Sequence, residues 1–155
     1  MISMEANFPY IPLSKKRVIA WREKVNTLAE TMKKMDQKEC PVTHRFAPGC
    51  YLREILIPED TVIIGKIHAT QHFNIILKGE ALVITAEERK KVSAGETFVS
   101  DAGIQKLVYA YSDCVWQTVH VTDKTDLEEI EKEVIASSYD QLEVDSLMKK
   151  LGDMS

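Results

Sequence analysis

Cysteine is scarce in this sequence, and its three copies are poorly placed for a disulfide framework or a zinc ribbon. Cys40, Cys50 and Cys114 are odd in number and widely separated, and no two of them form a Cys-x-x-Cys pair. Small domains that depend on disulfides carry more cysteines at closer spacing. We therefore predict free thiols, a reducing compartment and a cytoplasmic location.

Long apolar runs and an excess of positive charge are absent as well. No stretch approaches the roughly 20 apolar residues that span a bilayer. The first residues, MISMEANFPYIPLSKK, lack the basic start and apolar run of a signal peptide. The net charge is −4, with both signs interspersed. A surface with this charge does not attract a nucleic acid or an anionic membrane electrostatically. We therefore expect neither a DNA or RNA duplex nor a membrane as a partner.

What the sequence does have is enough apolar residues for one domain. Of its 155 residues, 45% are apolar and 28% are charged, as in ordinary soluble globular proteins. Three regions differ in pattern: an N-terminal arm and amphipathic helix (1–44), a β-rich region (45–122) and a C-terminal helical segment (123–155). Because the length suits one core better than two, we expect these regions to form one compact domain.

The helical part of the N-terminal region starts near Ser14, an N-cap candidate. Beyond it, apolar residues recur at alternating steps of three and four, which is typical of a helix with one apolar stripe. We expect this stripe to pack on the domain's own core. Since its spacing also fits a short heptad pattern, a seam in a homodimer or higher homo-oligomer is the alternative. The stripe consists of Val18, Trp21, Val25, Leu28, Met32 and Met35.

The β-rich region consists of short segments separated by turn residues, with no helical pattern between them. They cover residues 51–57, 61–68, 73–77, 81–85, 97–100, 106–111 and 115–121, with a further short one at Val92. This pattern predicts an antiparallel sandwich or barrel. After it, Thr125 and Glu128 have the spacing of a capping box, and a last amphipathic helix is predicted over residues 141–151.

Two stretches of the β-rich region resemble the paired motifs of the cupin superfamily. Residues 65–80, GKIHATQHFNIILKGE, resemble the first motif: a glycine, two histidines, an acid and a strand ending in a glycine turn. Residues 95–106, GETFVSDAGIQK, look like the second. The resemblance covers about residues 45–122 and implies a mainly β fold, a single jelly-roll barrel with helices at both ends. With the strand WQTVHVT at residues 116–122, the chain looks most like the uncharacterised cupin-like proteins of tailed bacteriophages.

The departures from the cupin motifs fall at the positions of the family's metal ligands. Counted back from Gly79, His68 stands at the second histidine and His72 at the acid. Lys66 stands at the first histidine, and Lys106 stands at the last one. A lysine ammonium is a poor metal ligand, because it must first lose its proton. Two lysines inside a barrel favour an anion instead.

Alternation along the strands predicts a pocket without reference to the family. Residues two apart on a strand share a face, so the polar residues at 66, 68 and 70, at 72 and 74, and at 116, 118, 120 and 122 can line one interior. In jelly-roll order the strand of His120 lies beside that of His72. We predict a pocket for a small anion, such as a nucleotide, in which the ligand contacts are Lys66, His72, Asn74, Lys106, Trp116 and Thr118. For Trp116 a plain core position is the alternative.

The first hypothesis for this pocket is a metal-independent phosphodiesterase acting on a nucleotide or cyclic nucleotide. Residues 68–70 (HAT) and 120–122 (HVT) are two His-x-Thr units, the signature of the two-histidine phosphoesterases, which have a different fold. One imidazole would accept a proton from the attacking oxygen, and the other would protonate the leaving oxygen. The threonine hydroxyls would bind phosphate oxygens. No cofactor is required, and the catalytic residues are His68, Thr70, His120 and Thr122.

Two further hypotheses use the same pocket. In one, His68, His72 and His120 bind a single divalent metal ion (Zn, Fe, Mn or Ni) and leave open positions for a substrate, as in a cupin dioxygenase, isomerase or lyase. In the other, the pocket binds a nucleotide without turnover, as a sponge or a virion-associated module. His44, before the first predicted strand, is interpreted as an ordinary surface histidine, and Cys114 as structural.

Overall fold

The computed structural model describes residues 12–135, with side chains from residue 16 onward. The helix predicted over residues 141–151 lies outside this part of the chain. The described elements are α2 (Pro12–Met32), β1 (Val42–Ala47), β2 (Cys50–Ile57), β3 (Val62–Ile64), β4 (His72–Lys78), β5 (Glu80–Ile84), β6 (Arg89–Ser93), β7 (Thr97–Ser100), β8 (Leu107–Ala110), β9 (Cys114–Val121) and α3 (Leu127–Val134).

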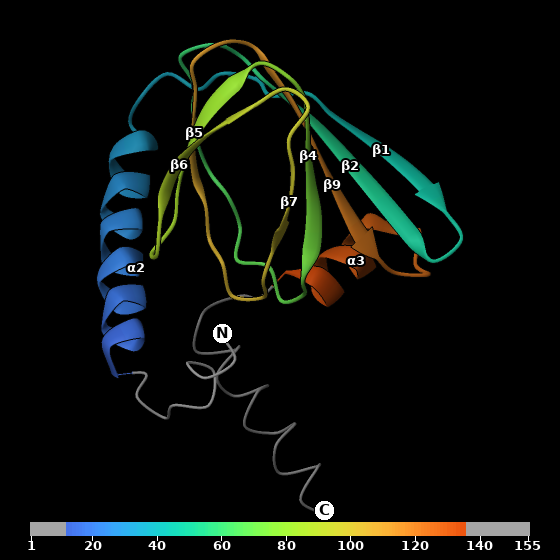
Figure 1. Cartoon of the computed structure of the whole chain (residues 1–155), viewed down its shortest axis with the longest axis horizontal. Helices are drawn as coiled ribbons and strands as arrows, with labels where there is room; N and C mark the ends of the chain where they lie inside the picture. The colour runs from blue at the N-terminus through green and yellow to red at the C-terminus, as the bar shows by residue number, and fades with distance from the viewer. Residues whose placement is uncertain (1–11, 136–155) are drawn as a thin grey trace, which may run out of the picture.

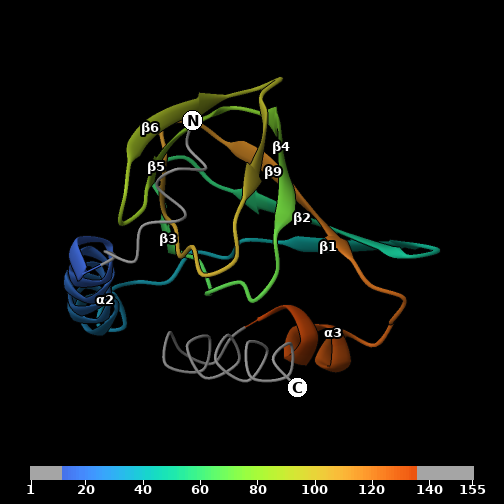
Figure 2. The same ribbon diagram turned by 60° about the horizontal axis from the view of Figure 1, so that its bottom comes forward.

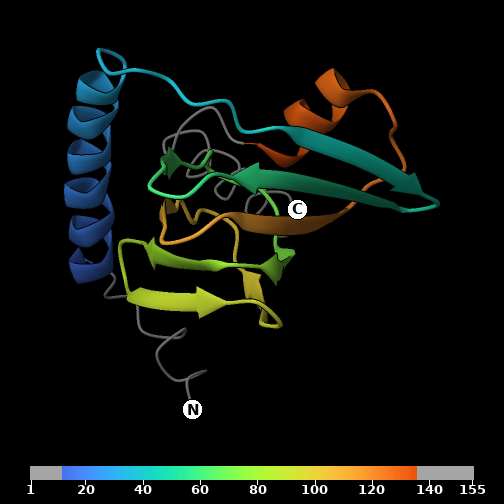
Figure 3. The same cartoon turned by 90° about the horizontal axis from the view of Figure 1, so that it is seen from above.

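The strands form two antiparallel sheets. One sheet has the order β1-β2-β9-β4-β7, and the other has the order β3-β8-β5-β6. Helix α2 stands beside the four-stranded sheet (Figure 1), and α3 lies across one end of the two sheets (Figure 2). Seen from above, β5 and β6 lie on one side of β9, and β1 and β2 lie on the other (Figure 3). The prediction of a mainly β, antiparallel fold with helices before and after the strands is confirmed.

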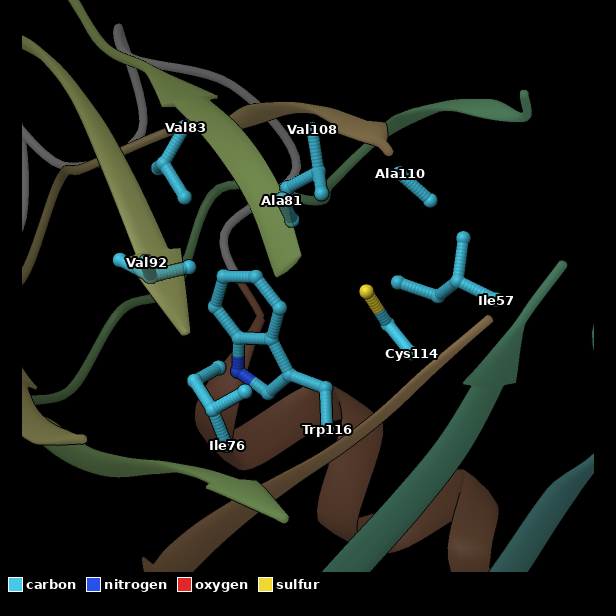
Figure 4. Packing of buried hydrophobic residues seen from close by; sticks show 9 residues of the cluster. All are labelled: Ile57, Ile76, Ala81, Val83, Val92, Val108, Ala110, Cys114 and Trp116. Carbon is cyan, nitrogen blue, oxygen red and sulfur yellow. The ribbon is translucent and has the colours of Figure 1, made fainter. Parts of the chain in front are cut away.

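The hydrophobic core fills the space between the two sheets. Side chains at alternate strand positions meet there, as expected for strands with one buried face. Trp116 is 5% exposed and its ring packs edge-on against Phe98, so it occupies the core position given as the alternative, while it also lines the pocket. Cys114 is also buried, as a structural cysteine should be. Figure 4 shows the cluster of Ile57, Ile76, Ala81, Val83, Val92, Val108, Ala110, Cys114 and Trp116.

The strand predicted over residues 61–68 is too long. β3 ends at Ile64, and the chain then leaves the sheet. The backbone of this segment bonds elsewhere: the Ala69 N–H donates to the Val134 carbonyl at 2.7 Å. His68 forms an isolated bridge with Ile135, and its carbonyl accepts a hydrogen bond from the Gly103 N–H at 2.8 Å. Because the partners of this backbone lie at the end of α3 and in the loop before β8, strict alternation does not apply around His68.

Only part of the apolar stripe predicted for helix α2 is buried. Val25 is 3% exposed, whereas Met35, which the prediction placed on the helix but which follows its end at Met32, is 62% exposed. The Trp21 indole Nε1–H donates to the Gln105 carbonyl at 3.3 Å, which attaches the helix to the loop before β8. The helix therefore packs on its own domain through its middle. A dimer seam along the remaining stripe stays a prediction.

Helix α3 is capped by Asp126 and not by the predicted Thr125. The Asp126 Oδ1 accepts a hydrogen bond from the Glu129 N–H at 3.1 Å. Asp is a stronger N-cap than Thr, and its charge is favourable at a helix N-terminus, so the predicted capping box with Glu128 is wrong by one residue. Among the described residues, no helix is long and apolar enough to cross a membrane.

Candidate functional site

The inward face of β2 and β9 carries polar side chains in register. Tyr51 pairs with His120, and Arg53 pairs with Thr118. The next inward pair, Ile55 with Trp116, is apolar. The face between the sheets is therefore polar at the start of β2 and becomes apolar toward its end.

The prediction that the strand of His120 lies beside that of His72 is confirmed. β4 and β9 are antiparallel neighbours, with Phe73 opposite Val119 and Asn74 opposite Thr118. His72 follows one step further along this ladder and comes beside His120. His68 reaches the same place from the loop after β3, so the three histidines come from two strands and one loop.

The rings of His68, His72 and His120 form one cluster. The ring centroids of His68 and His72 are 4.1 Å apart, those of His72 and His120 are 5.0 Å apart, and those of His68 and His120 are 5.5 Å apart. Each ring offers one nitrogen, and these three atoms lie within 4.8 Å of one another. His72 and His120 are 3% and 2% exposed.

One nitrogen of each ring in the cluster is buried without a hydrogen-bond partner among the described residues. These atoms are His68 Nδ1, His72 Nε2 and His120 Nδ1. The opposite nitrogen of His72 faces the Thr70 carbonyl at 3.3 Å, so Nδ1 donates and Nε2 keeps its lone pair. A buried polar atom left without a partner costs about 1–3 kcal/mol. A metal ion bound here would give each of the three nitrogen lone pairs a partner.

All three imidazoles are neutral at pH 7. Burial is the main cause, and it lowers the pKa of His68 to about 3, that of His72 to about 4 and that of His120 to about 4. The positive charge of Lys106 lowers the pKa of each ring further. Metal ions bind the neutral form of histidine, so no proton must be displaced near neutral pH.

Two cations line the pocket beside the cluster. Lys106 is 8% exposed, and burial, together with nearby Lys90, lowers the pKa of its ammonium to about 8. Arg53 is half-buried, and its charge contributes to the low pKa of His68 and of His120. Within residues 12–135, neither cation forms an ion pair with a carboxylate. Lys106 thus lies in the pocket, as predicted from the sequence. Arg53 is a second cation in the pocket that the sequence analysis did not predict.

Lys66, by contrast, lines the pocket at its exposed rim. Its side chain is 63% exposed and forms an ion pair with Glu131 of α3. The prediction that two lysines point into the interior is therefore wrong for this one. The reason is local: the chain has left β3, and the acidic α3 helix offers a carboxylate outside.

The two threonines of the His-x-Thr units lie away from the imidazole cluster. Thr70 is exposed, and it is its carbonyl that faces His72. Thr122 is buried, but its hydroxyl accepts from the backbone N–H of Lys124 at 3.2 Å. The structure thus brings the three histidines together and leaves these two hydroxyls elsewhere.

Asn74 and Trp116 are joined by hydrogen bonds inside the protein. The Trp116 Nε1–H donates to Asn74 Oδ1 at 3.1 Å, and the Asn74 amide donates to Ser100 Oγ at 2.9 Å. Asn74 is fully buried with both ends of its amide bonded. Its polar atoms are therefore used within the protein, although it lines the pocket.

The pocket itself has a volume of about 400 Å³. Its polar end holds His68 and His120 of the cluster together with Arg53 and Lys106, and the rest is largely apolar. The apolar walls come from both sheets and from α3, which covers one side. They consist of Ile55, Ile57, Ile63, Ile64, Val108, Trp116, Leu127, Ile130, Val134 and Ile135.

Sequence reasoning missed four polar residues that line the pocket: His44, Tyr51, Arg53 and Glu131. Tyr51 and Arg53 belong to the inward positions of β2, so alternation along the predicted strand 51–57 was a sufficient signal. His44 lies in β1 and not in a loop; it is exposed, as predicted, but its Nδ1 lies 2.6 Å from the Tyr51 hydroxyl. No pattern predicted β1, whose residues are mostly exposed.

Comparison with known proteins supports the fold. No protein-family model and no curated protein sequence matches the chain. Ectoine synthase from P. lautus is 15% identical, with 67% of this chain and 81% of that protein covered, at a TM-score of 0.52. An RmlC-like cupin family protein from Methanocaldococcus jannaschii is 16% identical, with 58% and 86% covered, at 0.47. A cupin-2 domain protein from Shewanella frigidimarina is 12% identical, with 61% and 92% covered, at 0.45. The chain shares its antiparallel fold with ectoine synthase, and the two other proteins to which it is similar are cupins.

Proposed function

We propose that this protein is a metal-dependent cupin enzyme, whose single divalent ion is held by His68, His72 and His120. The observation that carries the proposal is the buried cluster of three neutral imidazoles, each with one unpartnered nitrogen. Three protein ligands leave coordination positions free for a substrate, as in catalytic metal sites. Imidazole ligands suit zinc, iron and nickel best.

A divalent ion bound there would act as a Lewis acid on a substrate oxygen. The protein's own part is to orient the ligands and to limit the access of water. The Thr70 carbonyl holds the ring of His72, and the Thr118 hydroxyl lies 2.9 Å from the Nε2 of His120. Such outer partners fix the ring orientation and the tautomer of metal-binding histidines. The apolar wall of α3 covers one side of the site.

The metal-independent phosphodiesterase has weaker support. Acid–base catalysis by two histidines needs one imidazole protonated and the other neutral near the working pH. With pKa values of about 3 and about 4, His68 and His120 are both neutral at pH 7. The threonine hydroxyls that would bind the phosphate lie elsewhere. Phosphodiesterase activity, and equally a non-catalytic nucleotide sponge, therefore stay predictions from the sequence.

Metal analysis tests the proposal directly. Protein purified without a histidine tag, stripped with chelator and reloaded with Zn²⁺, Fe²⁺, Mn²⁺ or Ni²⁺ in turn, should bind about one ion per chain of at least one of these metals. His72→Ala should reduce the stoichiometry for that metal toward zero. His44→Ala is the matched control, because His44 is the histidine outside the cluster; it should bind metal like the unmodified protein.

Two results would contradict a metal centre. One is a stripped protein that binds none of these metals at micromolar concentration while its circular dichroism spectrum shows an intact fold. The other is equal metal binding by the His72→Ala and His44→Ala variants, since the ion would then lie elsewhere.

A further inference from the structure

The pocket holds two positive charges that no described carboxylate neutralises. Lys106 is 8% exposed, and Arg53 lines the same cavity from β2. Among the described pocket-lining residues, Glu131 supplies a carboxylate, but it is already paired with Lys66 at the rim. Cations in a poorly hydrated pocket are unfavourable unless an anion pairs with them. Within the part of the chain that the structure describes, these charges have no carboxylate partner, and an anionic ligand would supply one.

The proposed metal ion strengthens this argument. Its ligands would be three neutral imidazoles, so the protein contributes no negative charge at the centre itself. A divalent ion would add two positive charges to those of Arg53 and Lys106. The complete site then attracts an anion both at the metal and at the two side chains.

The remainder of the pocket selects for apolar groups. Along β2, the inward residues pass from Arg53 to Ile55 and Ile57, and the facing positions on β9 pass from Thr118 to Trp116. Isoleucines and valines of the other sheet and of α3 close the space. Apolar walls with a few polar groups at one end are the usual form of a site for a small organic ligand, and about 400 Å³ is within the usual size.

We propose that the pocket binds an organic acid, with its carboxylate between Arg53 and Lys106 beside the histidine cluster and its apolar body along the isoleucine walls. This inference rests on the proposed function, because it assigns the substrate class of the same pocket. The planar guanidinium of Arg53 can donate two parallel hydrogen bonds to one carboxylate, while the ammonium of Lys106 acts as a compact charge. A nucleotide fits less well, since its polar sugar would lie against apolar walls.

Calorimetric titration with matched probes tests the inference. The probes are hexanoate, hexanamide, inorganic phosphate and adenosine monophosphate, each added to stripped protein and to protein loaded with Zn²⁺. Hexanoate should bind more tightly than hexanamide, which has the same body without the charge, and more tightly than phosphate, which has the charge without the body. We expect about tenfold or more in each comparison.

Variants assign the contacts. Arg53→Met and Lys106→Met should each weaken hexanoate binding about tenfold or more, while zinc stoichiometry and the melting temperature stay close to those of the unmodified protein. Arg45→Met is the control, since Arg45 is an exposed arginine of neighbouring β1 that pairs with Glu54. It should bind hexanoate normally. The hexanoate affinity of Arg53→Lys should fall between those of Arg53→Met and the unmodified protein. Lysine keeps the positive charge but cannot donate two parallel hydrogen bonds from a planar group.

The outcomes separate this inference from the metal centre. Equal affinity for hexanoate and hexanamide, or hexanoate binding unchanged in both Arg53→Met and Lys106→Met, would overturn the organic-acid site even if zinc binds. Tighter binding of adenosine monophosphate would overturn it in favour of a nucleotide. Arg53-dependent hexanoate binding, together with failure of the stripped protein to take up Zn²⁺, Fe²⁺, Mn²⁺ or Ni²⁺, would support the acid site and refute the metal-centre proposal alone.

Discussion

The Thr118 hydroxyl lies 2.9 Å from His120 Nε2 within the same strand, and this contact leaves His120 Nδ1 as the atom without a partner. Because residues two apart on β9 share the inward face, the hydroxyl can fix the orientation of the ring. The alternation of side chains along β9 therefore helps to set the orientation of His120, one of the three proposed metal ligands.

Replacing Thr118 with valine should weaken metal binding. Valine keeps the shape of the side chain and removes the hydroxyl, so His120 loses the group that orients it. Loss of such an outer partner typically costs about 10–100-fold in metal affinity. Competition with a chromogenic zinc chelator measures the change.

Thr122→Val is the matched control for this change, because it removes a buried hydroxyl from the residues just after the same strand. It should leave zinc affinity unchanged and cost about 0.5–1.5 kcal/mol of stability, since the Lys124 N–H loses its acceptor. Equal zinc affinities for Thr118→Val and the unmodified protein would show that Thr118 does not orient the ring.

The stability of the stripped protein should fall in mild acid. The folded state holds the pKa of His68 near 3 and those of His72 and His120 near 4, below the ordinary value of 6.5. Below pH 6.5 the unfolded chain therefore binds protons that the folded chain does not, and stability decreases as pH falls toward 4. Each histidine adds a slope of up to about 1.4 kcal/mol per pH unit in this range, and none above it.

Urea denaturation at pH 7.5, 6.0 and 5.0 measures this dependence. His72→Gln should flatten the slope between pH 6.0 and 5.0, because one titrating group is removed. Identical slopes for His72→Gln and the unmodified protein would mean that the cluster does not resist protonation.

The turn after β4 depends on Gly79. Its φ of +86° is in the left-handed region, and a Cβ at this position would lie 2.3 Å from the Asp113 carbonyl oxygen. Gly79→Ala should therefore destabilise the protein by more than about 2 kcal/mol, through backbone strain and a clash with rigid backbone. Gly95→Ala is the control: its φ of +94° carries the same strain, but a Cβ there meets nothing within 4 Å.

Urea denaturation of the two alanine variants separates the clash from the strain. Gly95→Ala should lose only about 1 kcal/mol. A loss at Gly79 no larger than that at Gly95 would show that the Asp113 carbonyl can move away at little cost, and that the close approach does not determine the turn.

Strand alternation and motif spacing predicted the parts of the site that lie on regular strands. His72 and His120 come together as predicted because they sit on neighbouring strands at inward positions. Lys66 and Thr70 were misplaced because the chain leaves β3 at Ile64, and a two-residue period has no meaning in the loop that follows. The contribution of α3 could not be predicted either, since nothing in a local pattern tells which end of the sheets a helix will cover.

His72 distinguishes the metal centre from the two-histidine acid–base mechanism. Paired acid–base catalysis uses His68 and His120 for proton transfer and His72 only as a ligand contact, whereas a metal ion with three ligands needs all three rings. We expect His72→Ala to lose zinc binding as fully as His68→Ala and His120→Ala do. We also expect no hydrolysis of bis-(p-nitrophenyl) phosphate in excess chelator by the unmodified protein. Because chelator removes only the metal, hydrolysis that persists in it, survives His72→Ala and disappears in His68→Ala and His120→Ala would require the acid–base pair and would exclude a metal as the agent of that reaction.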